Sequence, residues 1–211
     1  MKLGEIKLET LMMICPGEQF EYDTDTLKDK LFDLRQNPNF SDFLASMPSA
    51  INRCFASLEQ KGIIPTKQVE LTKEKASLVG GRQRYLLSEI ITDFGSVDRV
   101  AHYSSNEYTE ACDYSFESAD VLLLEDISGT YVVIYTPKIE RVHLITSEEK
   151  EIALPHDICS IIPYFVKSEI LRSESPDEAS IARNIYEQMA GELITHKDSY
   201  QASVKNTYRI D

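Results

Sequence analysis

The stretch EIALPHDICSIIPYFVKSEILRSESPDEASIARNIYEQMAGEL, residues 151–193, decides the fold more than any other part of the chain. Its first half places five apolar residues three and four apart, the pattern of one helix face: Ile158, Ile161, Ile162, Phe165 and Val166. Its second half repeats the pattern with Ala179, Ala182, Tyr186, Met189, Ala190 and Leu193. Between the halves, Ser175-Pro176-Asp177-Glu178 has the composition of a capping box with proline at the first helical position. The stretch therefore predicts a helical hairpin.

Neither arm of this hairpin can bury its apolar stripe alone. We expect the two arms to pack antiparallel against each other and to need a further partner, because each is amphipathic. The residues expected to make the packing are Ile158, Ile162, Phe165, Tyr186, Met189 and Leu193. The hairpin is thus predicted to complete a larger helical bundle.

The first 65 residues supply the rest of that bundle. Residues 3–14 carry a broad apolar stripe, and a second helix is expected to begin at Thr26. Residues 40–62 repeat the helical spacing, with Gly62 placed as the left-handed residue that ends the helix and Pro65 preventing its continuation. These features predict a helical unit over residues 1–65.

From residue 66 to 153 short β-favouring runs replace the helical periodicity. We expect strands at residues 68–71, 84–91, 97–103, 120–124, 130–136 and 142–145. The clearest hairpin joins residues 121–124 to residues 131–135 across Ser128-Gly129. The predicted fold class is α+β: a bundle of N-terminal helices and the C-terminal hairpin of residues 154–194, interrupted by an antiparallel β-sandwich or barrel-like insertion over residues 66–153.

Residues 195–211 form a polar C-terminal arm without an apolar stripe. So short a segment has no core of its own, and chain ends of this kind are disordered unless something holds them. Two interpretations stay open, namely a frayed tail and an arm that docks on a neighbouring subunit. The anchors of a docking arm are expected to be Tyr200, Tyr208, Arg209 and Ile210.

Charge and composition restrict the function. The 22 basic and 35 acidic residues leave a formal charge of −13, which disfavours stable binding to DNA or to an anionic membrane. The first residues have charges within their apolar pattern, so we expect neither a signal peptide nor a membrane span. The four cysteines form no CxxC pair, and buried thiols in a reducing, intracellular place of folding are expected.

The sequence contains no recognisable catalytic or metal-binding motif. The four histidines lie in different segments without HExxH spacing, and no nucleophile elbow, Walker loop or GxGxxG pattern is present. We therefore expect no enzymatic activity, no cofactor and no metal. An enzyme whose site is assembled from scattered Asp, Glu and Tyr residues is a less favoured alternative.

The order of several short segments resembles the adaptor, or head-to-tail connector, proteins of tailed bacteriophages. The resemblance covers roughly residues 3–194. Its most specific part includes a leucine-proline start, an "IPY" helix with an internal proline, and an Asp/Glu-rich turn before an R-x-x-Y helix. The segments, in chain order, are 3–6, 49–54, 62–65, 84–87, 93–94, 131–137, 152–155, 161–170, 175–179 and 182–187.

This resemblance implies a structural virion protein at the head-tail interface, folded and assembled in the cytoplasm of the host bacterium. Its partners would be other copies of itself in a ring of twelve subunits, the portal protein, and the next neck or tail protein. Genomic DNA would pass through the ring without specific binding, and an acidic lining would let it slide. Another tail or baseplate ring protein with a β domain is the alternative.

Overall fold

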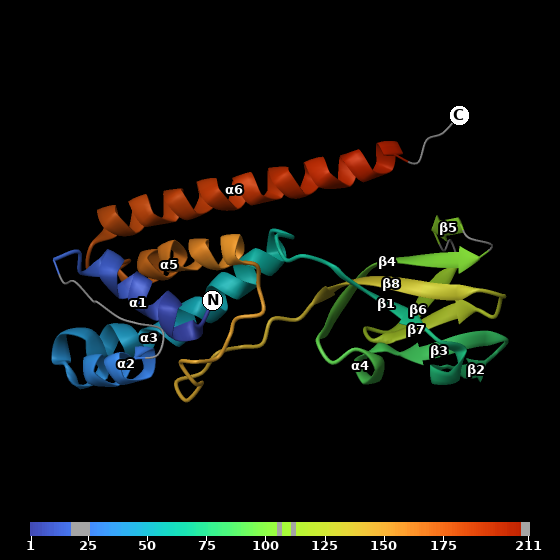
Figure 1. Ribbon diagram of the computed structural model, residues 1–211, viewed down its shortest axis with the longest axis horizontal. Helices are drawn as coiled ribbons and strands as arrows, with labels where there is room; N and C mark the ends of the chain where they lie inside the picture. Colours follow the sequence, from blue (N-terminus) through green and yellow to red (C-terminus); the bar gives the residue numbers. More distant parts are fainter. Residues whose placement is uncertain (18–25, 105–106, 111–112, 208–211) are drawn as a thin grey trace. The chain divides into compact units, whose positions relative to one another are not determined.

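A computed structural model describes the backbone of residues 1–17, 26–104, 107–110 and 113–207, and the side chains of most of them. The fold is α+β, as predicted, with six α-helices and two antiparallel sheets in these residues. The chain divides into two compact units: residues 1–63 together with 141–211, and residues 64–140. The first is helical, and the second contains both sheets (Figure 1).

The helical unit is built around helix α5, His156–Ile170. Helices α1 (Leu3–Ile14), α3 (Pro38–Gln60) and α6 (Pro176–Thr207) all contact α5, and α2 (Leu27–Gln36) packs against α1 and α3. Helices α5 and α6 are joined by a short turn and run antiparallel (Figure 1). Helix α6 starts at Pro176, where the sequence predicts it.

Local chemistry explains where α3 begins and ends. The side chain of Asn37 accepts a hydrogen bond from the amide of Asn39 at 3.0 Å, and Pro38 occupies the first turn. At the other end Gly62 has φ +65°, the left-handed conformation expected of it. The amide of Ile63 then donates to the carbonyl of Leu58 at 3.1 Å, which closes a Schellman motif.

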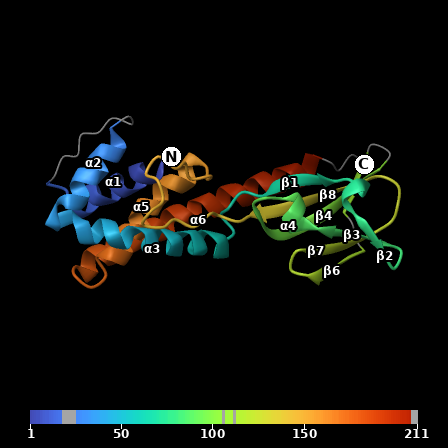
Figure 2. The same cartoon turned by 90° about the horizontal axis from the view of Figure 1, so that it is seen from below.

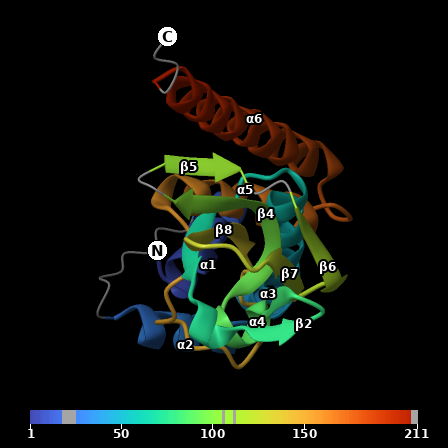
Figure 3. The same ribbon diagram turned by 90° about the vertical axis from the view of Figure 1, so that its right-hand side faces the viewer.

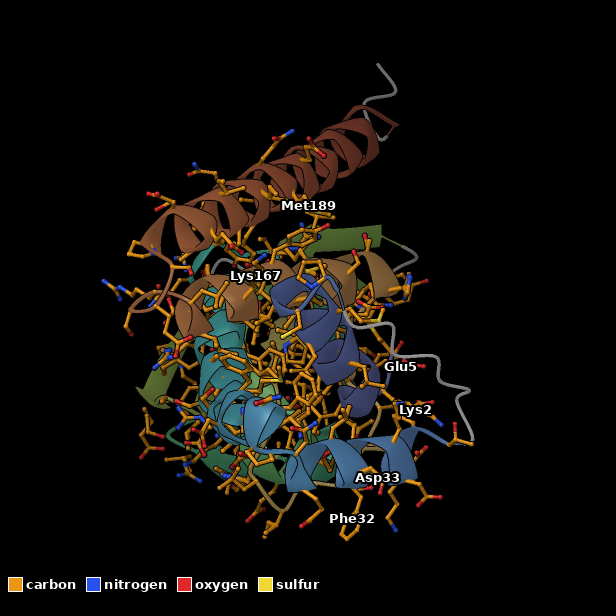
Figure 4. The ribbon with its side chains drawn as sticks, turned by 90° about the vertical axis from the view of Figure 1, so that its left-hand side faces the viewer. Lys2, Glu5, Phe32, Asp33, Lys167 and Met189 are labelled. Atoms are coloured by element: carbon orange, nitrogen blue, oxygen red, sulfur yellow. The ribbon has the colours of Figure 1, made fainter. Side chains whose placement is uncertain are left out.

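A glycine sets the spacing of α1 and α2. A Cβ atom at Gly4 would lie 2.7 Å from a methyl group of Leu27 and 2.9 Å from one of Leu31. Only glycine therefore lets the first turn of α1 approach α2 so closely. Figure 4 shows the opposite side of α2, where Phe32 and Asp33 point away from the bundle.

The β unit contains two four-stranded antiparallel sheets. One has the order β1 (Lys67–Leu71), β8 (Thr130–Pro137), β4 (Phe94–Ser104), β5 (Glu107–Glu110). The other has the order β2 (Ser77–Val79), β3 (Arg82–Leu86), β7 (Val121–Glu125), β6 (Tyr114–Ser118). A 3-10 turn, η1 (Lys73–Lys75), and a short helix, α4 (Leu87–Ile90), lie between strands.

The two sheets share one apolar core, so the unit is a sandwich (Figure 2). Alternate residues of both sheets supply it, among them Val100, Val133 and Tyr135 from one sheet and Tyr85, Leu122 and Leu124 from the other. The hydroxyl of the fully buried Tyr85 donates to Gln83 Oε1 at 2.5 Å. Strands 68–71, 97–103, 120–124 and 130–136 of the sequence analysis correspond to β1, β4, β7 and β8.

The predicted hairpin of residues 121–124 and 131–135 is wrong. Strand β7 pairs with β3 and β6, whereas β8 pairs with β1 and β4, so the two strands lie in different sheets. The turn at Gly129 (φ +118°) instead crosses from one sheet to the other, and Ser128 O lies 2.9 Å from His102 Nε2. Two apolar runs around a turn have the same sequence pattern whether the strands pair within one sheet or face each other from two sheets, and this explains the error.

Three further boundaries differ from the expectation. The predicted strand at residues 84–91 ends at Leu86 and continues as α4, and β5 and β6 lie between the strands expected at residues 97–103 and 120–124. Residues 142–145 form no strand. The second unit ends at residue 140 rather than 153, because residues 141–152 are bonded to the helical unit.

The C-terminal helix is longer than the predicted hairpin arm. Helix α6 has 32 residues and continues through Thr207, so residues 195–207, expected as a polar arm, are helical in their backbone. The side chain of Tyr200 and all of Tyr208, Arg209 and Ile210 lie outside the described residues. The expectation that they anchor a docking arm stays a prediction.

Candidate interaction surfaces

A clamp from Asn52 fixes the segment that follows the β unit. The Asn52 Nδ2 donates to the carbonyl of Val142 at 2.8 Å, and the amide of Val142 donates back to Asn52 Oδ1 at 2.9 Å. This pair satisfies both backbone groups of Val142, whose side chain is buried against the bundle. One side chain of α3 therefore holds residues 141–145 on the helical unit.

The clamped segment presents two large apolar side chains to solvent. A tight turn closes between His143 and Thr146: the His143 amide donates to Thr146 Oγ1 at 2.8 Å, and the Thr146 amide donates to the His143 carbonyl at 3.1 Å. Leu144 and Ile145 are the two residues at the tip, and they are 61% and 95% exposed. This exposed apolar pair makes the turn a candidate contact surface.

Between this turn and α3 lies an open groove of about 820 Å³. Small residues of α3, namely Ala45, Ser49 and Ala56, form its helical wall, and the tip residues form the other wall. The described charged side chains that line it are Arg53 and Arg141. The groove, which we call the α3 groove, is therefore lined by small and apolar side chains together with two basic ones.

Helix α6 carries a second apolar surface. Its inner stripe, Ala179, Ala182, Tyr186 and Ala190, is buried in the bundle. On the other side of the helix, Ile181 and Ile185 stand one turn apart and are 60% and 37% exposed. The exposed carboxylates of Asp177, one turn before Ile181, and Glu192, two turns after Ile185, extend the same face. We call these residues the α6 outer face.

Charged contacts on its inner side fix the rotation of α6. Arg183 lies over the ring of Phe165, with its guanidinium carbon 4.4 Å from the ring centroid, and its Nε is 3.1 Å from Glu187 Oε1. The Lys61 ammonium, 2.6 Å from the other oxygen of Glu187, lowers the pKa of that carboxyl. Glu169 joins Arg53 of α3 to Arg183 of α6, at 3.0 and 3.6 Å. Because these contacts hold one side of α6, its isoleucine side faces outward.

A buried ion cluster holds the segment between the turn and α5. Glu148 Oε1 accepts from Lys7 at 2.8 Å and also from Arg35, so one carboxylate joins residues 141–152 to α1 and α2. Burial lowers the pKa of the Lys7 ammonium, and Glu148 opposes this shift only in part. Within the described residues, Glu148 Oε2 is buried without a hydrogen-bond partner. Breaking such a cluster is costly, so the segment is firmly attached.

The predicted packing residues of the hairpin occupy two environments. Ile158, Ile162, Phe165 and Tyr186 are buried, and the rings of Phe165 and Tyr186 meet edge to face with centroids 5.0 Å apart. The Tyr186 hydroxyl donates to Ser57 Oγ of α3 at 3.0 Å. Met189 and Leu193 are half-buried, and Figure 4 shows Met189 on the side of α6 that faces α5.

Sequence reasoning missed both exposed surfaces. Residues 142–145 form an apolar run, which has the same composition in a buried strand and in an exposed turn. Ile181 and Ile185 are large apolar residues outside the stripe that defines the inner face of α6. Their position off the stripe was the one signal in the sequence that this side of α6 is also apolar. Asn52, which decides where Val142 lies, is 90 residues away in the chain.

No protein-family model matches the chain, and no curated protein matches it either. In the described part of the chain, no helix combines the length and apolar character that crossing a bilayer requires. The same residues contain no group of three or more His, Cys, Asp or Glu side chains arranged to hold a metal ion.

Proposed function

We propose that this chain is a structural protein of a tailed bacteriophage virion, the adaptor that joins the portal to the neck or tail. Copies of the chain form a ring on the portal, present their far side to the next neck or tail protein, and leave a channel for the genome. The chain has no enzymatic role in this proposal. It folds in the host cytoplasm and ends in the virion.

The observation that carries the proposal is a pair of different apolar surfaces on the helical unit. Figures 1 and 3 show α6 along one side of this unit and the stretch that precedes α5, which includes the turn at residues 143–146, on the opposite side. Two unlike surfaces on opposite sides suit a head-to-tail contact, which closes into a ring when it is repeated with rotation. A two-fold dimer needs only one self-complementary surface.

The charge of the chain supports the proposed channel. Both units contain more acidic than basic residues, which together give the formal charge of −13. An acidic wall repels the phosphate backbone, so DNA passes without being held. Specific DNA binding would instead require a cluster of lysine and arginine side chains.

The positions of the resembling segments are also consistent with this proposal. The "IPY" segment lies in α5, with Pro163 inside the helix, and the acidic turn begins α6. The segment of residues 49–54 contains Asn52 and Arg53, which border the α3 groove. The most specific part of the resemblance thus falls in the unit that carries both exposed surfaces.

Mass measurement with and without portal protein tests the proposal. The chain is mixed with the portal protein encoded by the same phage genome, and the complexes are weighed by native mass spectrometry and imaged by electron microscopy. We expect a ring, or a monomer that assembles when portal is added. A ring that ignores portal favours the alternative of another tail or baseplate protein, and a monomer indifferent to portal contradicts both.

A further inference from the structure

The α3 groove and the α6 outer face have complementary chemistry. The groove offers apolar walls, with Leu144 and Ile145 on one side, and its lining includes Arg141 and Arg53, of which Arg53 also pairs with Glu169. The α6 outer face offers Ile181 and Ile185 between the carboxylates of Asp177 and Glu192. An apolar pair flanked by acids matches an apolar groove flanked by bases, and such matching specifies orientation as well as contact.

The groove wall is long enough to take the apolar centre of the α6 outer face. The wall of the groove runs from Ala45 to Ala56 on α3, which is three turns or about 16 Å at the rise of an α-helix. The α6 outer face runs from Asp177 to Glu192, about four turns or 22 Å, and its apolar pair, Ile181 and Ile185, spans one turn near the middle. Small side chains on the α3 wall let a second helix approach closely, because the distance between packed helices depends on the side chains at the contact.

We propose that the α3 groove of one copy binds the α6 outer face of a second copy of this chain. This proposal names the contact between neighbouring copies in the proposed ring. It rests on the proposed function only for the claim that the repeated contact closes into a ring. Ile181 and Ile185 are exposed on the side of α6 that is turned away from the bundle, so a copy does not fill its own groove. A neighbour supplies the missing half, and each added copy leaves a groove and an outer face for the next.

We assign the groove to a second copy because one chain carries both a groove with basic side chains and a helix face with acidic ones. The chain as a whole is acidic, and Arg141 places an exposed basic side chain in the lining of the groove. A basic side chain there attracts an acidic, apolar helix face, and the α6 outer face has this composition. Each copy presents both halves at the same concentration.

Two single variants, measured alone and mixed, test the pairing. Ile145→Glu places a charge in the groove and leaves the α6 outer face intact, whereas Ile181→Glu does the reverse. Both positions are exposed, so each variant is expected to fold, as checked by circular dichroism. We expect the dissociation constant for self-association, measured by sedimentation velocity, to rise about tenfold or more in each variant alone.

The mixture gives the decisive result. Ile145→Glu still has a face and Ile181→Glu still has a groove, so the two variants share one intact contact. We expect a one-to-one heterodimer that grows no further, resolved by native mass spectrometry with one variant isotopically labelled. The matched control is Phe32→Glu, because Phe32 is also a helical residue and is 61% exposed, close to the value for Ile181. It should associate as the wild type does.

Several outcomes overturn the pairing. These are a wild-type chain that stays monomeric at its highest soluble concentration, variants that associate normally, and variants that lose association without forming a heterodimer when mixed. Loss of portal binding with normal self-association would assign the surfaces to portal instead. The proposed function is judged separately: recruitment by portal despite failed pairing leaves it standing, and pairing without portal binding removes it.

Discussion

Single polar side chains join parts of the helical unit that are far apart in the chain. Asn52 holds the backbone of Val142, Glu148 joins the same segment to α1 and α2, and Glu187 joins α6 to Lys61. Asn52 also lines the α3 groove, whereas Glu148 and Glu187 belong to neither proposed surface. They matter because they decide which apolar side chains remain on the surface.

At this scale we predict that acid weakens the contact between Glu187 and Lys61. The hydrogen bond from Lys61 lowers the folded-state pKa of Glu187 below its ordinary value of 4.5, so the ionised carboxylate stabilises the fold. This contribution is present above the ordinary pKa and is lost as the pH falls through the lowered folded-state pKa. Glu187→Gln should melt below the wild type at pH 7, and the difference should vanish at acidic pH.

Thermal unfolding followed by circular dichroism between pH 2 and pH 7 measures this difference. The control is Glu174→Gln, since Glu174 is exposed in the turn between α5 and α6 and should show little difference at any pH. A gap between Glu187→Gln and the wild type that stays constant over the whole range would contradict the prediction.

At the scale of elements, the central position of α5 organises the helical unit. It contacts α1, α3 and α6, and its aromatic residue Phe165 is almost fully buried where α5 meets α6. Because Arg183 also lies over this ring, one side chain of α5 supports both the apolar and the charged contacts of α6. The orientation of the α6 outer face depends on this packing.

We predict that Phe165→Ala lowers the free energy of unfolding by about 3–5 kcal/mol, because it leaves a cavity beside Tyr186 and Arg183. Urea unfolding monitored by circular dichroism gives the value. Phe32→Ala is the matched control, since Phe32 is an exposed helical phenylalanine and should change stability by less than about 0.5 kcal/mol. A loss below about 1 kcal/mol for Phe165→Ala would mean that its ring is not part of the core.

At the scale of the whole molecule, the β unit is one continuous segment inserted into a helical unit that is discontinuous in sequence. Residues 64–140 contain both sheets and the core between them, whereas the helical unit needs both ends of the chain. The two units are therefore expected to differ in whether they can be separated.

We predict that residues 64–140, expressed alone, fold and unfold cooperatively, because they contain their own core. The comparison is with residues 64–153, the end expected from sequence. The added residues should contribute no stability, since their partners, Asn52 and Lys7, belong to the helical unit. Chemical denaturation of both fragments tests this, and a clearly more stable longer fragment would contradict the boundary at residue 140.

Much of the fold follows from local patterns. The helices at residues 3–14 and 40–62 and the start of α6 at Pro176 agree with the spacing of apolar residues and with caps such as Gly62. Of the candidate surfaces, the sequence indicated the buried side of α6 but not its outer face. The α3 groove was not predictable, because it depends on a contact between Asn52 and a segment that resembles a strand.

The sequence by itself determined the α+β class, the helical character of both ends of the chain with β structure between them, and the inner stripe of the hairpin, because periodicity and caps act over a few residues. Only the tertiary structure decided that β7 and β8 lie in different sheets, that residues 141–152 belong to the helical unit, and that Leu144, Ile145, Ile181 and Ile185 are exposed. These outcomes depend on which distant surfaces meet, and an apolar residue has the same local pattern whether or not its partner lies within its own chain.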